Sequence, residues 1–292
     1  MRALVIGASG QVGAALCVRL TELGHRVVGT HARTAQAGTR HLDFTNVAAT
    51  QQLIAETAPD WIFCPAGLTA VDYCEAHPDE ALAANRDAPA AAARVGVPFV
   101  FYSTEYVFDG GAGPYSEHDA VHPVSVYGRS KLEGERAVLM VNPRALVVRT
   151  TVVYGPDPQG KNFVYQLLRR GRARERTLVA VDQRSSPTYN ADLAAVSIEL
   201  IERALCGVVH VAGPEVVDRY AFALKVCDVF GLDPAFLVPA TTAELRQPAA
   251  RPLAAGLVID RVRGLVNTEL RGPAAGLAAM QRELEASKVS VG

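Results

Sequence analysis

A glycine-rich segment that directly follows a short apolar run constrains this chain more than any other feature. The segment reads GASGQVG at residues 7–13, after Leu4, Val5 and Ile6. Glycines at this spacing let the backbone turn tightly between a strand and a helix, and their missing side chains let a pyrophosphate approach the helix N-terminus. The spacing is GxxGxxG rather than the commoner GxGxxG, so a plain tight turn is the alternative. The predicted phosphate cradle consists of Gly7, Ser9, Gly10, Gln11, Val12 and Gly13.

Apolar runs and helix-like segments alternate along the first half of the chain. This alternation is typical of crossover units on a parallel sheet that is covered on both faces. We predict strands at 3–6, 26–30, 61–64, 98–103 and 146–150. We predict the helices between them at 11–23, 47–57, 78–95 and 124–140. The predicted fold is therefore α/β, a Rossmann-type doubly wound parallel sheet.

The regular alternation loosens after Tyr154, which sets a soft boundary near residue 155. Beyond it we predict a strand at 208–212, an irregular Pro- and Ala-rich segment at 234–256, and helices at 162–170, 191–204, 218–230 and 274–285. We therefore expect a dinucleotide-binding domain at residues 1–155 and a smaller α+β substrate-binding portion at residues 156–292. The two portions can be interleaved, because later segments are able to pack back onto the first sheet.

The composition excludes several classes of protein. A net charge of −1 over 292 residues provides no general attraction for nucleic acid or an anionic membrane. The five cysteines lack CxxC spacing and the seven histidines lack metal-ligand spacing, so we expect neither a disulfide framework nor a metal site. The sequence shows no signal peptide and no apolar stretch of membrane-spanning length. We expect a cytoplasmic protein that acts on a small molecule.

The segment after the second predicted strand bears on the choice of cofactor. An NAD site usually places Asp or Glu here to bind the ribose 2′-hydroxyl, and residues 30–33 contain neither. Arg33, together with His31, can instead pair with a 2′-phosphate, which favours NADPH and leaves NADH as the alternative. A solvated Arg33 is the simpler interpretation. Asp43 and Phe44 follow the next short strand, where Asp43 can accept a hydrogen bond from the adenine amino group or cap the following helix.

A second motif can move a proton. Tyr127 and Lys131 are four residues apart in the predicted helix 124–140, so they share a face. A lysine ammonium near a phenol stabilises the phenolate and lowers the tyrosine pKa toward the range that acid catalysis needs. Ser103 and Thr104 end a predicted strand at the sheet edge where α/β sites lie, and a hydroxyl there can bind a substrate carbonyl. Together with the cradle, this set predicts a nicotinamide-dependent oxidoreductase; an ordinary amphipathic helix is the alternative.

These motifs fall within a wider resemblance. The chain is similar to the extended short-chain dehydrogenases/reductases, specifically to the dTDP-4-dehydrorhamnose reductase family, which includes the regulatory β subunit of methionine adenosyltransferase. The segments that carry the resemblance span nearly the whole chain: GASGQVG (7–13), AGLTAVDYCE (66–75), Asn85, STEYVFDG (103–110), PYSEHD (114–119), VYGRSKLEGE (126–135), VVRTTVVYG (147–155), DQRSSPTY (182–189) and Arg251-Pro252.

The resemblance implies a reductase that uses NADPH to reduce the 4-keto group of a nucleotide-linked 6-deoxy sugar. It implies Thr104, Tyr127 and Lys131 as the catalytic residues, with Lys131 also binding the nicotinamide ribose, and Asn85 as a support near the cofactor. The residues that it adds to the cofactor site are Ala66 and Gly67. The implied substrate-binding residues are Thr69, Val71, Asp72, Ser103, Glu105, Tyr106, Arg184 and Arg251.

Two positions depart from the family pattern, and other functions stay open. Glu105 stands where the family usually has Asp, and Ser185 replaces a usual Gly, which leaves the sugar and the nucleotide undetermined. A non-catalytic dinucleotide-binding regulatory subunit and a nucleotide-sugar epimerase that retains NAD are the alternatives. The resemblance also leaves a homodimer open. Five arginines at 169–176 can reach a diphosphate or form a solvated helix end.

Overall fold

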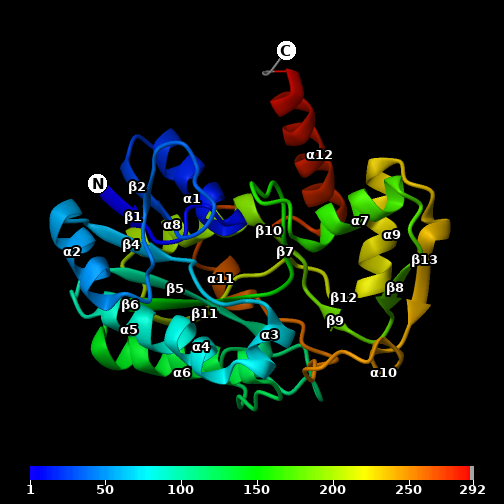
Figure 1. Ribbon diagram of the computed structural model, residues 1–292, viewed down its shortest axis with the longest axis horizontal. Coiled ribbons are helices and arrows are strands. Elements are labelled where there is room, and N and C mark those ends of the chain that lie inside the picture. The colour runs from blue at the N-terminus through cyan, green and yellow to red at the C-terminus, as the bar shows by residue number, and fades with distance from the viewer. Residues whose placement is uncertain (290–292) are drawn as a thin grey trace.

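A seven-stranded parallel sheet forms the centre of the molecule (Figure 1). The computed structural model describes residues 1–289. The strand order is β11-β6-β5-β4-β1-β2-β3, and all neighbours pair in parallel, which confirms the predicted doubly wound α/β fold. The strands are β1 (Arg2–Val5), β2 (Arg26–His31), β3 (Thr39–His41), β4 (Trp61–Cys64), β5 (Phe99–Thr104), β6 (Ala145–Thr150) and β11 (Gly207–His210).

Two layers of helices cover the sheet, because its apolar side chains alternate between the faces. Val5 and Phe63 belong to one core, and their chain neighbours Leu4 and Ile62 belong to the other. The first core is covered by α1 (Gln11–Glu22) and α8 (Asn190–Glu202). The second core is covered by α2 (Val47–Thr57), α5 (Ala88–Ala93) and α6 (Val126–Val141).

The remaining C-terminal elements form a smaller α+β region at one side of the sheet (Figure 1). Its strands β8 (Thr177–Ala180) and β13 (Leu237–Ala240) pair in parallel. A separate core, which includes Tyr154 and Phe222, packs its helices α7 (Phe163–Arg172), α9 (Arg219–Phe230) and α12 (Pro273–Val289). Two short strand pairs connect it to the rest of the chain: β7 (Val153–Tyr154) with β10 (Thr188–Tyr189), and β9 (Arg184–Ser185) with β12 (Val217–Asp218).

Two predicted elements differ from the observed ones. The helix predicted at 78–95 is divided into α4 (Pro78–Leu82), the π-helical turn η1 (Ala83–Asp87) and α5. The segment 234–256, predicted to be irregular, contains β13, because Leu237–Ala240 can pair with the edge of β8 despite its proline. The short elements are α3 (Val71–Ala76), α10 (Thr242–Leu245), α11 (Asp260–Arg263), η2 (Glu105–Val107) and η3 (Pro234–Phe236).

The second half of the chain contributes to the central sheet. β11 pairs with β6 at the sheet edge, and α8 packs against α1 over the first core. Both elements lie beyond residue 155, so the sheet is completed by segments from the C-terminal half. Across residues 1–289, no helix has both the length and the apolar character needed to cross a membrane.

Candidate active site

The glycine-rich segment forms a tight turn at the carboxyl end of β1. Gly7 has a φ of +98°, and a Cβ atom at this position would lie 3.0 Å from the backbone of Ala66. At Gly13, a Cβ atom would lie 2.2 Å from the carbonyl oxygen of Gly7, which leaves no room for any side chain. Helix α1 follows Gly10, and no side chain caps its first turn. The amides of that turn are therefore available to an anion.

The residues of this turn also contact the C-terminal half of the chain and the first core. Gln11 Nε2 donates to the carbonyl of Val153 at 3.2 Å, and Gln11 Oε1 accepts from Asn162 at 3.0 Å. The carbonyl of Ser9 accepts a hydrogen bond of 2.9 Å from Gln159. Val12 packs against the first core. The C-terminal half thus holds the cradle in place, and the backbone of the turn remains the part that can bind phosphate.

The second predicted cofactor segment lies at the ends of β2 and β3. His31 Nδ1 pairs with Thr39 Oγ1 at 2.7 Å, and Arg33 is exposed without an ion pair to any described residue. Asp43 is exposed, and its Oδ1 accepts from the amide and hydroxyl of Thr45, which lowers the pKa of Asp43. Asp43 does not cap α2, since Asn46 is its N-cap. Phe44 is buried.

The catalytic residues implied by the resemblance lie together where β5 and α6 meet. Tyr127, Lys131 and Thr104 are each at most 8% exposed. Lys131 Nζ lies 4.1 Å from the centre of the Phe101 ring, and a Cβ atom on Gly67 would lie 3.7 Å from it. This ammonium donates to no acceptor in the part of the chain that the structure describes. A buried cation without a partner is typical of a ligand site.

Asn85 connects the loop after β4 to helix α6. Its Oδ1 accepts from the amide of Leu68 at 2.9 Å, and its Nδ2 donates to the carbonyl of Leu68 and to Ser130 Oγ. The residue lies in the π-helical turn, a feature that often marks functional sites. Asn85 thereby fixes the loop that contains Ala66 and Gly67 beside Lys131.

Burial dominates the electrostatics of the Tyr127–Lys131 pair. Burial raises the pKa of Tyr127, the Glu105 carboxyl raises it further, and a hydrogen bond with Thr104 opposes the rise. Burial also lowers the pKa of Lys131 to about 8. The predicted lowering of the Tyr127 pKa by Lys131 is not borne out, because burial raises that pKa and Lys131 is not among the main groups that shift it. Tyr127 therefore keeps its proton at neutral pH, as an acid must.

Three of the residues expected to bind substrate contact other protein groups instead. Ser103 donates to Glu135, which lies on α6 one turn after Lys131. Glu105 accepts from the hydroxyl groups of Thr104 and Thr151. Asp72 pairs with Arg251 at 2.9 Å. The proton of the Ser103 hydroxyl is therefore donated to Glu135 rather than held free for a substrate carbonyl.

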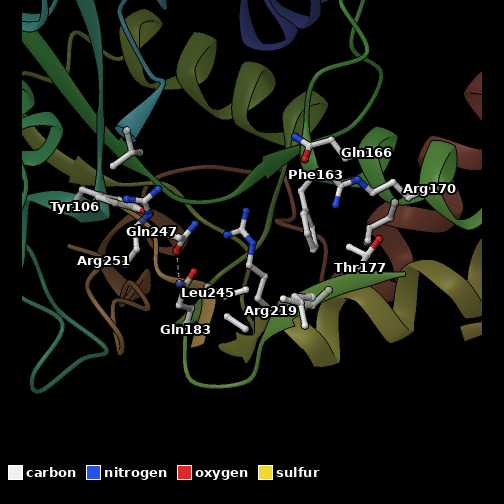
Figure 2. Close-up of a pocket in the computed structure, with 15 residues that line it drawn as sticks. Tyr106, Phe163, Gln166, Arg170, Thr177, Gln183, Arg219, Leu245, Gln247 and Arg251 are labelled. Atoms are coloured by element: carbon white, nitrogen blue, oxygen red, sulfur yellow. Dashed lines mark hydrogen bonds between the residues drawn. The ribbon is translucent and has the colours of Figure 1, made fainter. Parts of the chain in front are cut away.

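A cavity of about 290 Å³ adjoins this cluster (Figure 2). Of the residues expected to bind substrate, Val71, Tyr106 and Arg251 line it, and Tyr106 contacts the Tyr127 ring edge-on. Thr69 and Arg184 are exposed and do not line it. The other lining residues are Phe163, Gln166, Leu167, Arg170, Thr177, Leu178, Val179, Ala180, Gln183, Arg219, Leu245 and Gln247.

The model of the family described as RmlD substrate binding domain matches residues 1–286. The chain belongs to this family.

Relatives in and around the RmlD family include named reductases. A dTDP-4-dehydrorhamnose reductase from Streptomyces griseus is 38% identical over 86% of this chain and 83% of its own length. A probable dTDP-4,6-dihydroxy-2-methyloxan-3-one 4-ketoreductase from Streptomyces antibioticus is 37% identical over 93% of this chain and 91% of its own length. A crystal structure of dTDP-4-dehydrorhamnose reductase from Bacillus anthracis str. Ames with NADP has a TM-score of 0.88 at 30% identity, covering 97% of this chain and 99% of that one.

Sequence reasoning missed part of the cavity of this RmlD-family chain. Arg219 points into the cavity and stacks on Phe163, with its guanidinium carbon 4.5 Å from the ring centre (Figure 2). Gln183 donates to Gln247 at 3.1 Å across the cavity wall. Of the five arginines at 169–176, only Arg170 lines the cavity. No local motif marks Arg219, and its position was not accessible from spacing alone.

Proposed function

We propose that this protein uses NADPH to reduce the 4-keto group of a nucleotide-linked 6-deoxy sugar. The observation that carries the proposal is the buried cluster of Thr104, Tyr127 and Lys131 beside the glycine cradle. The names of the RmlD-family relatives support the substrate class, and the relative solved with NADP supports the cofactor. NADH remains the alternative cofactor.

The cradle fits a dinucleotide. The turn at Gly7 and Gly13 excludes side chains where a pyrophosphate would approach, and the uncapped N-terminus of α1 supplies amides and positive potential. The exposed Arg33 is available to a 2′-phosphate beyond β2. The buried ammonium of Lys131 would bind ribose hydroxyls. When bound, NADPH supplies the hydride for the ketone carbon.

Tyr127 supplies the proton. As negative charge develops on the carbonyl oxygen, the phenol of Tyr127 donates its proton to that oxygen and the alcohol forms. The hydroxyl of Thr104 donates a hydrogen bond to the same oxygen and stabilises the developing charge. Lys131 is cationic below its pKa of about 8 and lies one helical turn from Tyr127 on α6.

The cavity is suited to the nucleotide diphosphate. Arg219, Arg170 and Arg251 provide guanidinium groups, which match phosphate oxygens in pairs. Phe163 and Tyr106 offer ring faces and edges beside them. We therefore assign cofactor binding to residues 1–155 and most of substrate binding to residues 156–292, with Val71 and Tyr106 contributed by the first portion.

A turnover assay tests the proposal. Purified protein is mixed with a panel of 4-keto nucleotide sugars and NADPH or NADH, and loss of the reduced-nicotinamide absorbance is followed. Tyr127→Phe should lower kcat by a factor of about 10² or more while NADPH affinity stays the same, because only the proton donor is lost.

Tyr102→Phe is the matched control, since Tyr102 is also buried on β5 but belongs to the first core, away from the site. Wild-type turnover by Tyr127→Phe would overturn the proton-donor role. Failure of every ketone in the panel would favour a regulatory subunit instead.

Two further proposals concern the cellular setting. The five free cysteines support a reducing, cytoplasmic compartment. Met140, which is 81% exposed, lines a groove between α5 and α6 together with Ala90, Ala91, Ala137 and Val141, and we propose a homodimer through this face. Light scattering of the purified protein, compared with Met140→Glu, tests the dimer: a monomer in both samples would reject it.

A further inference from the structure

The guanidinium group of Arg251 is held by a carboxyl group from the other half of the chain. Arg251 Nη2 donates to Asp72 Oδ2 at 2.9 Å, and Arg251 Nη1 donates to the carbonyl of Ala249 at 2.8 Å. Asp72 Oδ1 accepts in turn from the amide of Ala249 at 3.1 Å. Asp72 and Arg251 are 179 positions apart in the sequence, so this contact joins the N-terminal portion to the segment between α10 and α11.

Arg251 keeps hydrogen-bond donors for a ligand. A guanidinium group has five N–H donors. Asp72 and Ala249 accept from two of those of Arg251, and the other three donate to no residue that the structure describes. The Arg251 side chain is only 7% exposed, and it lines the cavity. A nearly buried guanidinium group with unused donors on a cavity wall is suited to an anion.

A second guanidinium group in the same cavity explains why Arg251 needs to be held. Arg219 also lines the cavity and forms no ion pair within residues 1–289. Burial lowers the pKa of Arg219, and the nearby positive charge of Arg251 contributes to this lowering, so the two groups repel each other. Figure 2 shows Arg251 beside Tyr106 and Arg219 nearer to Phe163. A long side chain that its neighbour repels keeps one rotamer only if a partner fixes it, and Asp72 is that partner.

Asp72 is itself fixed relative to the candidate catalytic residues. It lies in the first turn of α3, and Glu75 of the same helix accepts a hydrogen bond of 3.0 Å from the amide of Val126, the first residue of α6. Helix α3 also shares a small apolar core with Tyr127. Arg251, by contrast, lies outside any helix or strand. Asp72 therefore ties a loop residue to the helix that packs against Tyr127.

We propose that Asp72 is a positioning residue that holds Arg251 ready to bind a phosphate of the nucleotide diphosphate. The inference rests on the proposed function for the identity of the anion. Asp72 touches no substrate in this scheme, which changes its role from the direct binding that the resemblance implied to support of Arg251. Because Arg251 is already immobilised, the ligand does not bear the cost of ordering it, which is worth about two- to tenfold in affinity.

A competing role for Asp72 predicts a different result. The Asp72 side chain is 43% exposed, and its negative charge also repels phosphate. If this competition were its main effect, Asp72→Asn and Asp72→Ala would both bind the anion more tightly than wild type, and equally well. The two variants have the same charge, but only the asparagine keeps an oxygen that can accept from Arg251. Their comparison therefore separates positioning from charge.

Calorimetric titration with uridine diphosphate and with thymidine diphosphate tests the proposal. The protein is first saturated with NADP, so that the glycine cradle is filled and the titrated nucleotide reports on the cavity. Asp72→Ala should bind the nucleoside diphosphate about two- to tenfold more weakly than Asp72→Asn, because only the asparagine still holds Arg251. Arg251→Met should bind it about tenfold or more weakly than wild type.

Two controls show whether the effect passes through Arg251. In an Arg251→Met background, Asp72→Asn and Asp72→Ala should bind the nucleoside diphosphate equally well. Glu175→Ala is the matched control for loss of an acidic partner, because Glu175 lies 3.8 Å from Arg170, another arginine of the cavity. Both members of that pair are well exposed, so the affinity should stay at the wild-type value.

Steady-state kinetics supply a readout that general damage to the fold would not give. With a ketone that the protein reduces, Asp72→Ala should have a KM about two- to tenfold higher than that of Asp72→Asn, at the same kcat and the same affinity for NADPH. A merely structural role would lower kcat and the affinity for NADPH as well. Thermal unfolding of each variant verifies that it is folded.

Three results would overturn the inference. They are equal affinities of Asp72→Asn and Asp72→Ala, a difference between them that persists in the Arg251→Met background, and failure of wild-type protein to bind either nucleoside diphosphate. Absence of ketone reduction together with the expected difference in affinity would reject the proposed reduction and leave the role of Asp72 established. Ketone reduction together with equal affinities would do the reverse.

Discussion

Glu105, directly after strand β5, and Glu135, on helix α6, are both almost completely buried. Glu135 is held by Arg149 in a two-pronged pair, with distances of 2.9 Å and 2.7 Å, and also accepts from Ser103. Glu105 accepts from the hydroxyl groups of Thr104 and Thr151, forms no ion pair within residues 1–289, and has its pKa raised by burial. A guanidinium favours the charged form of a buried carboxyl group, and burial disfavours it. The comparison teaches that two equally buried acids can differ in how their charge is compensated.

The largest expected effect comes from removing Arg149, the cation that is paired with the buried Glu135. Arg149→Met leaves Glu135 charged and buried without a counter-ion, and the free energy of unfolding should fall by about 3–5 kcal/mol. Chemical unfolding at pH 7 measures it. Arg219→Met is the control near Glu105, because Arg219 forms no ion pair with that residue. An equal loss of unfolding free energy in Arg149→Met and Arg219→Met would contradict the distinction between the two buried acids.

A second effect is the pH dependence of stability that arises from His210, which lies near Arg149. His210 is fully buried beside Phe108, and burial lowers its pKa to about 4. Between pH 6.5 and 4 the unfolded chain therefore binds a proton that the folded chain does not. The free energy of unfolding should therefore fall, through His210, by up to about 1.4 kcal/mol for each unit by which the pH is lowered in this range. Unfolding of wild type and His210→Leu across this range isolates the slope, and parallel curves would contradict it.

The smallest effect compares two hydroxyl donors. Ser103→Ala removes a hydrogen bond to the carboxyl group that is paired with Arg149 and should cost about 2 kcal/mol, whereas Thr151→Val removes one to a carboxyl group without an ion pair and should cost about 1 kcal/mol. Thermal unfolding of the two variants, converted to free energy at a common temperature, measures the difference. A greater loss in Thr151→Val would contradict this order.

Local sequence patterns predicted the sheet and the cradle well. The strand 61–64 and the helix 47–57 were predicted with their observed bounds, because apolar runs and helix periodicity are local properties. Tyr127 and Lys131 share a helix, so their spacing alone places them on one face. The predictions that they bind or catalyse remain to be tested by the variants above.

Contacts between distant segments could not be predicted from local patterns. Ser103 and Thr104 are adjacent, yet the first donates to Glu135 and the second to Glu105, and both contacts depend on how the chain packs around β5. Thr151 reaches Glu105 across 46 positions of sequence. Arg219 enters the cavity only because α9 folds against α7. These relations are set by tertiary packing, which spacing does not reveal.

The return of β11 and α8 to the central sheet means that the chain cannot be divided at residue 155 without damage. A fragment that ends there would lack an edge strand, and the apolar faces of β1 and α1 would lose the helix that shields them from water. An engineer who wishes to exchange substrate preference between relatives should therefore transplant the cavity-lining segments individually. A wholesale swap of the C-terminal half would also replace β11 and α8, which complete the sheet and the first core of the N-terminal half.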